Sequence, residues 1–278
     1  MEPVKVVMSG VPGKMGLIIS RHMVKDDRFI LLPQALTGPG VPEKAVDVGG
    51  FGLLPAGPAR HREVLSGLLE KEGEFIVVDY SHPTAVNANA ELYASLSIPF
   101  VMGTTGGDRA ALARAVENSG ASAVIAPNMA KPIVGLTAMM EYAAQNFPGL
   151  FKGYKLAVRE SHQKGKADTS GTARAMVSYF NAMGVDFPVE AIESERDPDR
   201  QRFDWKIPLD HLGGHGYHTY TLTSPDGTVT VSFTHNILGR DVYYDGTADA
   251  VIFLKSRLRE RARGKVYSMT DVLRGKRA

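Results

Sequence analysis

A glycine-rich turn near the N-terminus stands between an apolar segment and a helix-forming one. Val4 to Met8 is apolar, the turn is Gly10-Val-Pro-Gly-Lys-Met-Gly16, and the helical segment runs from Leu17 to Val24. Glycines here permit a tight turn and let a pyrophosphate approach the N-terminus of the helix. This order predicts a Rossmann-like nucleotide-binding domain, although a glycine turn without a ligand is a competing interpretation. The expected cofactor contacts in this glycine turn are Gly10, Val11, Pro12, Gly13, Lys14 and Met15.

Three later apolar segments of the N-terminal half each end in small or polar residues. They cover residues 76–79, 99–102 and 121–125, and helix-like segments alternate with them. In an open parallel sheet, ligands bind beyond the carboxyl ends of the strands. We therefore expect these ends to line one crevice with the glycine turn. The additional cofactor contacts expected there are Gly103, Thr104, Thr105, Ala126, Pro127, Asn128 and Met129.

The second apolar segment, Phe29 to Leu36, bears on the choice of cofactor. Rossmann domains that bind NAD usually have an acidic residue near the end of this strand, where it holds the ribose hydroxyls. Here Thr37 and Gly38 follow the strand, and neither is acidic. Lys14 can meet the 2′-phosphate of NADPH, and a lysine that contacts only water is the alternative. The sequence predicts NADPH as the preferred cofactor, with NADH also used.

Composition limits the classes of function. The 278 residues carry a net charge of +2, which gives no reason to expect nucleic acid or a membrane surface as a partner. The absence of cysteine excludes disulfides and thiolate metal sites. No apolar run approaches the length of a membrane span, and the chain enters a strand almost at once, so a cytoplasmic protein is expected. The basic tail from Arg257 to Ala278 is expected to present a solvated helix face.

The second half of the chain has a different pattern. A helix is expected at 134–147, a short strand at 154–158, and further extended segments at 189–196, 202–207, 218–224 and 228–235. This grouping predicts an α+β domain with a mixed, largely antiparallel sheet. We expect it to span 131–240 and to serve substrate binding and oligomerisation. Residues 1–130 and 241–278 would form the dinucleotide-binding domain, which a helix at 246–261 completes.

Four histidines lie on or near the extended segments of the second half: His211, His215, His218 and His235. Their spacing matches no standard zinc signature, so no metal site is predicted. We expect structural histidines with hydrogen-bonded rings. His215, which lies between two glycines, is the one placed to edge a site.

A polar run from Glu160 to Thr172 precedes a helix-like segment. Unpaired polar groups are costly to bury, so the run is predicted to be a loop that faces solvent or a ligand. His162 and Lys166 supply a proton donor and a cation. A helix that begins near Ser170, capped by that serine or by Asp168, would offer N–H groups to an anion such as a carboxylate. A loop that only connects two elements is the alternative.

Together these motifs resemble those of the 4-hydroxy-tetrahydrodipicolinate reductase family, also called the dihydrodipicolinate reductases. The resemblance runs nearly end to end and is most specific in the polar run, which is similar to the family motif His-His-x-x-Lys-x-Asp-x-Pro-Ser-Gly-Thr. Gln163 stands where most bacterial members have the second histidine. Asp168-Thr-Ser170 is one residue shorter than the usual pattern and lacks its proline. Both differences, and the segment His235-Asn-Ile-Leu-Gly-Arg240, resemble the plant-like branch.

The resemblance implies an NAD(P)H-dependent oxidoreductase of lysine and diaminopimelate biosynthesis. In this family 4-hydroxy-tetrahydrodipicolinate is reduced by a hydride to tetrahydrodipicolinate, and the hydroxyl leaves as water. By resemblance His162 is the acid–base residue and Lys166 is the proton donor. An imidazole with its ordinary pKa of about 6.5 suits proton transfer at neutral pH. The residues that would bind the cyclic dicarboxylate substrate are Gln163, Ser170, Gly171 and Thr172, and a homo-oligomer, dimer or tetramer, is expected.

Two alternative functions remain open at this point. A non-catalytic dinucleotide sensor would have no need of His162 and Lys166. Another two-domain dehydrogenase of amino-acid metabolism, acting for example on aspartate or homoserine, would lack the pattern from Lys166 to Thr172.

Overall fold

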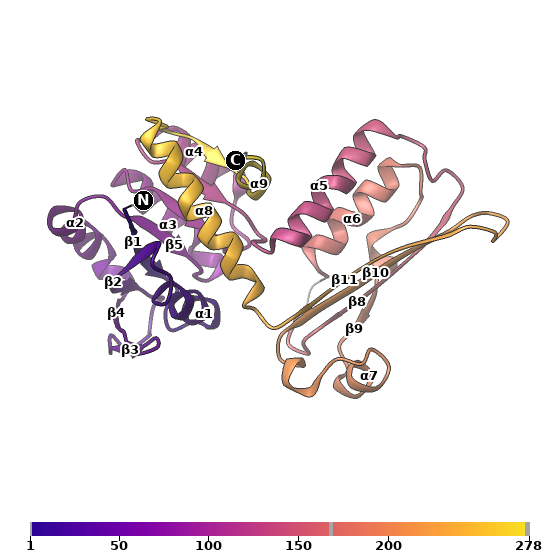
Figure 1. Cartoon of the computed structure of the whole chain (residues 1–278), viewed down its shortest axis with the longest axis horizontal. Coiled ribbons are helices and arrows are strands. Elements are labelled where there is room, and N and C mark those ends of the chain that lie inside the picture. Colours follow the sequence, from indigo (N-terminus) through magenta and orange to yellow (C-terminus); the bar gives the residue numbers. More distant parts are fainter. Residues whose placement is uncertain (1, 167–168, 276–278) are drawn as a thin grey trace. The chain divides into compact units, whose positions relative to one another are not determined.

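The computed structural model describes residues 2–166 and 169–275, and the chain divides into two compact units (Figure 1). Unit 1 comprises Met1–Lys131 and Asp241–Ala278, and unit 2 comprises Pro132–Arg240. The chain therefore leaves unit 1 once and returns to it for its last segment. No helix within the described ranges is long and apolar enough to cross a membrane.

Within the described residues, unit 1 is built on an eight-stranded sheet of order β12-β7-β6-β5-β1-β2-β4-β3. The strands are β1 (Val4–Ser9), β2 (Phe29–Leu36), β3 (Val46–Asp47), β4 (Gly52–Ala56), β5 (Ile76–Asp79), β6 (Phe100–Met102), β7 (Ala123–Ile125) and β12 (Val266–Tyr267). Neighbouring strands are parallel, apart from the antiparallel pair β3 and β4. The order β4-β2-β1-β5-β6-β7 is that of a doubly wound Rossmann fold, so the predicted fold class is confirmed.

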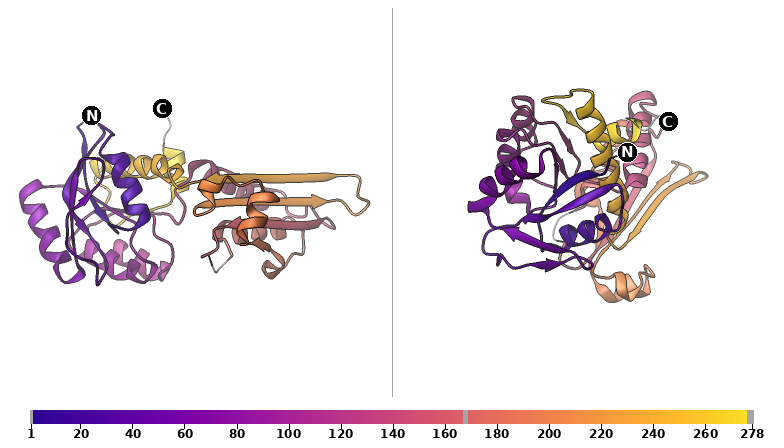
Figure 2. Two further views of the ribbon diagram at one scale, coloured as in Figure 1. Left: turned by 90° about the horizontal axis from the view of Figure 1, so that it is seen from below. Right: turned by 60° about the vertical axis from the view of Figure 1, so that its left-hand side comes forward.

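Helices cover both faces of the unit 1 sheet (Figure 2). They are α1 (Lys14–Met23), α2 (His61–Glu72), α3 (Val86–Ser95), α4 (Arg109–Glu117), α8 (Val242–Arg259) and α9 (Met269–Gly275). α1 packs beside α8, and α3 packs beside α4. The central strands are continuous apolar runs because both of their faces are buried. Val77 and Phe100 of the sheet share a core with Tyr93 and Leu112 of the helices.

Unit 2 combines a four-stranded sheet, in the order β11-β10-β8-β9, with two long helices. Its elements are α5 (Lys131–Asn146), β8 (Lys155–His162), α6 (Gly171–Ala182), β9 (Glu193–Glu195), α7 (Pro198–Phe203), β10 (His215–Thr223) and β11 (Thr230–Leu238). β10 is antiparallel to β8 and β11, and β9 is parallel to β8, so the sheet is mixed and largely antiparallel, as predicted. α5 and α6 lie side by side over the sheet (Figure 1). Met176 and Phe180 of α6 belong to one core with Val158 and Tyr220.

Of the extended segments predicted in unit 2, 202–207 is wrong and 189–196 is right only in part. Residues 202–207 lie at the end of α7 and in the turn after it. Asp197 caps this helix by accepting hydrogen bonds from the N–H groups of Asp199 and Arg200, and Pro198 occupies its first position. Residues 189–191 form a 3₁₀ turn, and only Glu193–Glu195 pairs as a strand. Both predictions relied on short alternations of apolar and polar residues, which do not distinguish a strand from a turn.

The C-terminal tail contributes to the sheet and the core, which corrects the prediction of a solvated helix face. Val266 and Tyr267 form β12 and pair with β7. Met269 and Val272 of α9 are buried. The basic composition of the tail concealed these apolar positions, because only a few of them are needed to fix a short element to the sheet edge.

Candidate functional site

The glycine turn connects β1 to α1 at the carboxyl end of a central strand of unit 1. Gly10 has a φ of +97°, and an added Cβ would lie 2.3 Å from the carbonyl oxygen of Tyr80. At Gly16 an added Cβ would lie 2.5 Å from the carbonyl oxygen of Gly10. Only glycine fits such contacts, so the packing of the turn requires these residues whether or not a ligand binds. The exposed residues of the turn are Pro12, Gly13 and Lys14.

Parallel pairing brings the other predicted cofactor residues to the same edge of the sheet. Ser9 of β1 is in register with Asp79 of β5, Asp79 with Met102 of β6, and Met102 with Ile125 of β7. The segments that follow these strands therefore begin at one level, beside the glycine turn. The predicted residues gathered along this edge are Gly10–Met15, Gly103–Thr105 and Ala126–Met129; of these, Val11, Thr104, Ala126 and Met129 are buried.

The side chain of Thr104 is engaged within the protein. Its Oγ1 donates to Oδ1 of Asp79 at 3.1 Å. The Asp79 carboxylate is fully buried and also accepts hydrogen bonds from Ser81, Asn89 and Tyr93. This network holds the segments after β5 and β6, and it engages the hydroxyl hydrogen of Thr104 within the protein. Sequence reasoning missed the role of Asp79. An acidic residue at the end of an apolar strand was the feature that could have pointed to it.

In unit 2, β8 continues through His162, so the polar run does not begin as a loop. Glu160 and Ser161 are fully buried, and the prediction that the run faces solvent is wrong for them. The prediction assumed unpaired groups, whereas Oγ of Ser161 lies 2.9 Å from Nε2 of His215 and Glu160 contacts several donors. Strand register places Glu160 opposite His218, and His218 opposite His235, in one row across β8, β10 and β11.

The Glu160 carboxylate is the centre of a network of polar contacts. Oε1 pairs with the guanidinium of Arg196 and accepts from Oγ of Ser194 at 3.1 Å, and Oε2 accepts from the Ser170 N–H at 3.1 Å. Burial raises the pKa of the Glu160 carboxyl. His218, with its Nε2 at 3.6 Å, and Arg196 outweigh burial and bring this pKa to about 2. Glu160 is therefore ionised at neutral pH.

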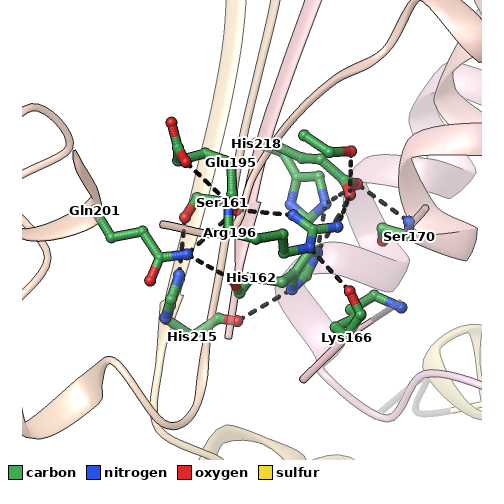
Figure 3. A network of polar contacts seen from close by, with 11 residues as sticks. Ser161, His162, Lys166, Ser170, Glu195, Arg196, Gln201, His215 and His218 are labelled. Carbon is green, nitrogen blue, oxygen red and sulfur yellow. Dashed lines mark hydrogen bonds and ion pairs between the residues drawn. The ribbon is translucent and has the colours of Figure 1, made fainter. Parts of the chain in front are cut away.

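Both ring nitrogens of His162 lie close to partners (Figure 3). Nδ1 is 3.1 Å from the carbonyl oxygen of His215, and Nε2 is 3.2 Å from Nε2 of His218. Gly216 is paired opposite His162, and an added Cβ there would lie 3.1 Å from the His162 ring, so glycine makes room for the imidazole. Burial lowers the pKa of His162 to about 4, with His218 adding to the shift and Glu160 opposing it. The ring is neutral at pH 7, which corrects the expectation of an ordinary pKa near 6.5.

The remaining predicted substrate residues lie between β8 and α6. The Lys166 N–H donates to the Gln163 carbonyl at 2.9 Å, and the Lys166 carbonyl accepts from Nε of Arg196 at 3.0 Å. These bonds tie the start of the loop to the Glu160 network. Ser170 is the N-cap residue of α6, but its side chain makes no capping bond. Asp168, the alternative cap, lies outside the described residues, and Gly171 and Thr172 form the first turn of α6.

Sequence reasoning missed three residues that hold His162 and Glu160. Arg196 pairs with Glu160, Nε2 of Gln201 donates to the His162 carbonyl at 2.6 Å, and His218 contacts the His162 ring. None of the three belongs to a sequence motif. Cross-strand register was the one signal that would have found His218, and it requires the tertiary structure.

The prediction of hydrogen-bonded structural histidines holds for His215, holds at one ring nitrogen for His218 and fails for His235. His215 has partners at both ring nitrogens, Oγ of Ser161 and the carbonyl oxygen of His211. Within the described residues, neither ring nitrogen of His235 has a hydrogen-bond partner, nor does Nδ1 of His218. Burial lowers the pKa of His235 to about 4, and His218 and His162 act in the same direction.

The stability of the protein is expected to fall between pH 6.5 and pH 4. His162 and His235 have folded-state pKa values of about 4, below the value of about 6.5 in an unfolded chain. Each neutral ring therefore stabilises the fold fully above pH 6.5, and this contribution is lost as the pH falls through the folded pKa. At pH 5 the loss in the free energy of unfolding is about 1–2 kcal/mol for each ring.

Urea unfolding at pH 7.5 and pH 5.0 measures this loss. His235→Phe should lose less stability on acidification than the wild type, and an equal loss contradicts the assignment.

Two family models match the chain. One, described as “Dihydrodipicolinate reductase, N-terminus”, covers residues 4–129, and the other, “Dihydrodipicolinate reductase, C-terminus”, covers residues 133–273. The second model runs past Arg240 into the segment that packs in unit 1. The two models together span nearly the whole chain.

Individual relatives and a solved structure point the same way. The chloroplastic 4-hydroxy-tetrahydrodipicolinate reductase 2 of Arabidopsis thaliana is 44% identical over 272 residues, which cover 98% of this chain and 77% of the relative. The 4-hydroxy-tetrahydrodipicolinate reductase of Thiobacillus denitrificans is 30% identical and covers 97% and 98%, respectively. A dipicolinate-bound dihydrodipicolinate reductase from Paenisporosarcina sp. TG-14 shares the fold, with a TM-score of 0.65 at 17% identity over 96% of this chain and 97% of that one. This chain belongs to the dihydrodipicolinate reductase family.

Proposed function

We propose that this protein catalyses the NAD(P)H-dependent reduction of 4-hydroxy-tetrahydrodipicolinate to tetrahydrodipicolinate, with loss of water, in lysine and diaminopimelate biosynthesis. The observation that carries the proposal is the arrangement in unit 2. His162, the loop at Lys166 and the start of α6 at Ser170 are all tied to one buried carboxylate, Glu160. The relatives described above are named for this activity.

The proposed roles of His162 and Lys166 follow from the chemistry of water loss. One group must take a proton from the carbon beside the hydroxyl-bearing carbon, and another must give a proton to the departing hydroxyl. Neutral His162 serves as the proton acceptor, and the ammonium of Lys166 serves as the donor. His162 then returns its proton to carbon when the double bond is reduced. A bound nicotinamide supplies the hydride for that reduction.

The substrate carboxylates are assigned to the residues around the start of α6. The first turn of a helix has N–H groups without intrahelical acceptors, and its dipole favours an anion. Gly171 and Thr172 provide such groups, Ser170 provides a hydroxyl that makes no capping bond, and Gln163 provides an amide. Unit 2 is accordingly proposed as the substrate domain.

Unit 1 is proposed as the cofactor domain, with the pyrophosphate at the start of α1. Lys14→Ala is expected to weaken NADPH binding about tenfold and to leave NADH within about twofold, which corresponds to a charged contact reduced by solvent. Lys14 is exposed and has no hydrogen-bond or ion-pair partner in the described part of the chain. Calorimetric dissociation constants for both cofactors test this, with exposed Lys25→Ala as the control. Equal weakening of both cofactors, or tighter NADH binding by the wild type, would remove the 2′-phosphate role of Lys14.

An assay of NADPH oxidation tests the proposed reaction. The substrate is the condensation product of pyruvate and aspartate semialdehyde, and tetrahydrodipicolinate is the expected product. A dinucleotide sensor would bind NADPH in this assay without oxidising it. Another two-domain dehydrogenase would oxidise NADPH only with its own substrate.

We also propose a homo-oligomer assembled through unit 2. Apolar side chains that monomers rarely leave exposed lie on α5 and just after it. Their exposed fractions are 64% for Met139, 61% for Tyr142, 50% for Phe147 and 53% for Leu150. Light scattering after gel filtration should give the mass of a dimer or tetramer. The double variant Met139→Glu, Tyr142→Glu should shift this mass toward that of the monomer.

The cytoplasm is the proposed compartment, and imaging of a tagged chain tests this because the plant relatives are named chloroplastic.

A further inference from the structure

The scheme above leaves unused a buried histidine that contacts the proposed base. Glu160, His218 and His235 form a row across the unit 2 sheet, and the His162 ring meets this row at His218. His218 is 4% exposed. Its ring stacks on His235 with centroids 4.5 Å apart and meets the edge of the His162 ring at 4.9 Å. His218 is therefore held in place on both sides.

Hydrogen bonding determines which ring nitrogens of His162 and His218 carry hydrogen at this contact. The His215 carbonyl can only accept, so the contact at 3.1 Å places the hydrogen of His162 on Nδ1. Nε2 of His162 is then a lone pair. The contact of 3.2 Å with His218 is a hydrogen bond only if Nε2 of His218 carries a hydrogen. The other tautomer of His218 would set two lone pairs face to face and bury a hydrogen on Nδ1, which has no partner among the described residues.

We propose that His218 is a positioning residue whose Nε2–H occupies the lone pair of His162 Nε2 and so keeps that ring oriented and neutral until substrate arrives. This inference rests on the acid–base role proposed for His162. Oε2 of ionised Glu160 lies 3.6 Å from Nε2 of His218 and 3.9 Å from Nε2 of His162. When His162 takes a proton from the substrate, its Nε2 can no longer accept a hydrogen bond from His218. The Nε2–H of His218 then donates to Glu160, and the same carboxylate offsets the new positive charge on His162.

The effect of His218 on the proton affinity of His162 has a defined direction. A hydrogen bond donated to the lone pair exists only while His162 is neutral, so its loss raises the pKa of His162. Glu160, which favours the charged ring, remains in place. The charged, titratable and polar groups around His162 are Glu160 on β8, His218 and the His215 carbonyl on β10, His235 on β11, Arg196 after β9, and Lys166 on the following loop.

A shared metal ion is the competing explanation for this cluster. Nitrogens of His162 and His218 and an oxygen of Glu160 lie close enough together to hold one. Metal binding would need a lone pair on Nε2 of both histidines, which places the buried His218 hydrogen on the unpartnered Nδ1. It would also bring a cation close to Arg196, which pairs with the same carboxylate. A shared hydrogen has neither disadvantage.

The test is a histidine NMR titration of the full chain without ligands, with His162 identified by the signal missing from His162→Gln. We expect wild-type His162 to carry its hydrogen on Nδ1 and to titrate near pH 4. His218→Phe should raise the midpoint by about one pH unit or more, because it removes the donor. In His218→Gln, which can present an N–H at the same place, the His162 midpoint should stay within about half a pH unit of the wild-type value.

The control His235→Phe keeps a ring stacked on His218 and should leave the His162 midpoint unchanged. The acidic limb of kcat/KM should move with the NMR midpoint in each variant.

Several results would overturn this role. They are an unchanged midpoint in His218→Phe, an equal change in His235→Phe, or activity that a chelator abolishes. A hydrogen on Nε2 of neutral His162 in the wild type would also do so, and that measurement does not depend on the folding of any His218 variant. Failure of the proposed acid–base role looks different: His162→Gln would keep its turnover, while the His162 midpoint would still respond to His218.

Discussion

Lys166→Ala and His162→Gln are each expected to lower kcat by roughly a hundredfold or more, because positioned acid–base groups typically contribute this much. Lys166 is the proposed donor to the departing hydroxyl, and neutral His162 is the proposed acceptor of the carbon-bound proton. Neither residue belongs to the glycine turn or to unit 1. The affinity for NADPH should therefore stay within about twofold of the wild type. Steady-state kinetics and a fluorescence titration with NADPH measure the two quantities.

Lys164→Ala is the matched control for this prediction. Lys164 lies in the same loop, two residues before Lys166, and is exposed. Its removal takes away the same charge without removing a proposed proton donor, so kcat should remain near that of the wild type. If Lys166→Ala and His162→Gln both turn over at near-normal rates, these residues have no part in the mechanism. An equal loss in Lys166→Ala and Lys164→Ala would point to the net charge of the loop instead.

Gly246→Ala is expected to destabilise the protein by about 3 kcal/mol or more, since the clash involves backbone that cannot turn away. Gly246 lies on α8, and an added Cβ would be 1.8 Å from the carbonyl oxygen of Met129. Either α8 or the segment after β7 must move. Because that segment carries predicted cofactor contacts, the affinity for NADPH should fall as well. Urea unfolding and a cofactor titration on the soluble fraction test both effects.

Gly67→Ala is the control for the glycine prediction. Gly67 is an exposed residue within α2, and an added Cβ there meets no atom within 4 Å. Alanine should stabilise this helix by about 0.5–1 kcal/mol, because glycine loses more backbone freedom on folding. If both variants change stability by similar amounts, the contact between Gly246 and Met129 does not govern the packing of α8.

The architecture of unit 1 was predictable because its signals are local. β2 occupies Phe29–Leu36, as predicted from one apolar segment, and the glycine turn lies between β1 and α1. Parallel strands that alternate with helices leave few possible topologies, since crossovers are short and right-handed. The gathering of the loops after β1, β6 and β7 at one edge follows from that topology. The sequence pattern was therefore sufficient to group the predicted cofactor residues.

The weaker predictions concern elements that long-range contacts stabilise. β12 has only two residues and exists because it pairs with β7, far away in the sequence. α7 is an exception, because it is set by a local cap and a proline, whose effect a short alternating pattern concealed. Glu160 and Ser161 looked too polar to bury, yet they are buried with partners that include Ser194, 34 residues after Glu160, and His215, 54 residues after Ser161.

The sequence by itself determined the fold class and the family and predicted His162 and Lys166, because these depend on the order of segments and on a specific motif. Only the tertiary structure decided how His162 is held. Its pKa of about 4 comes first from burial and then from His218, and both require the sheet of unit 2 to form. The register between β8 and β10 places Glu160 opposite His218 and gives His162 the space beside Gly216. Proton affinity depends on solvation and on charges a few ångströms away, and chain order does not specify either.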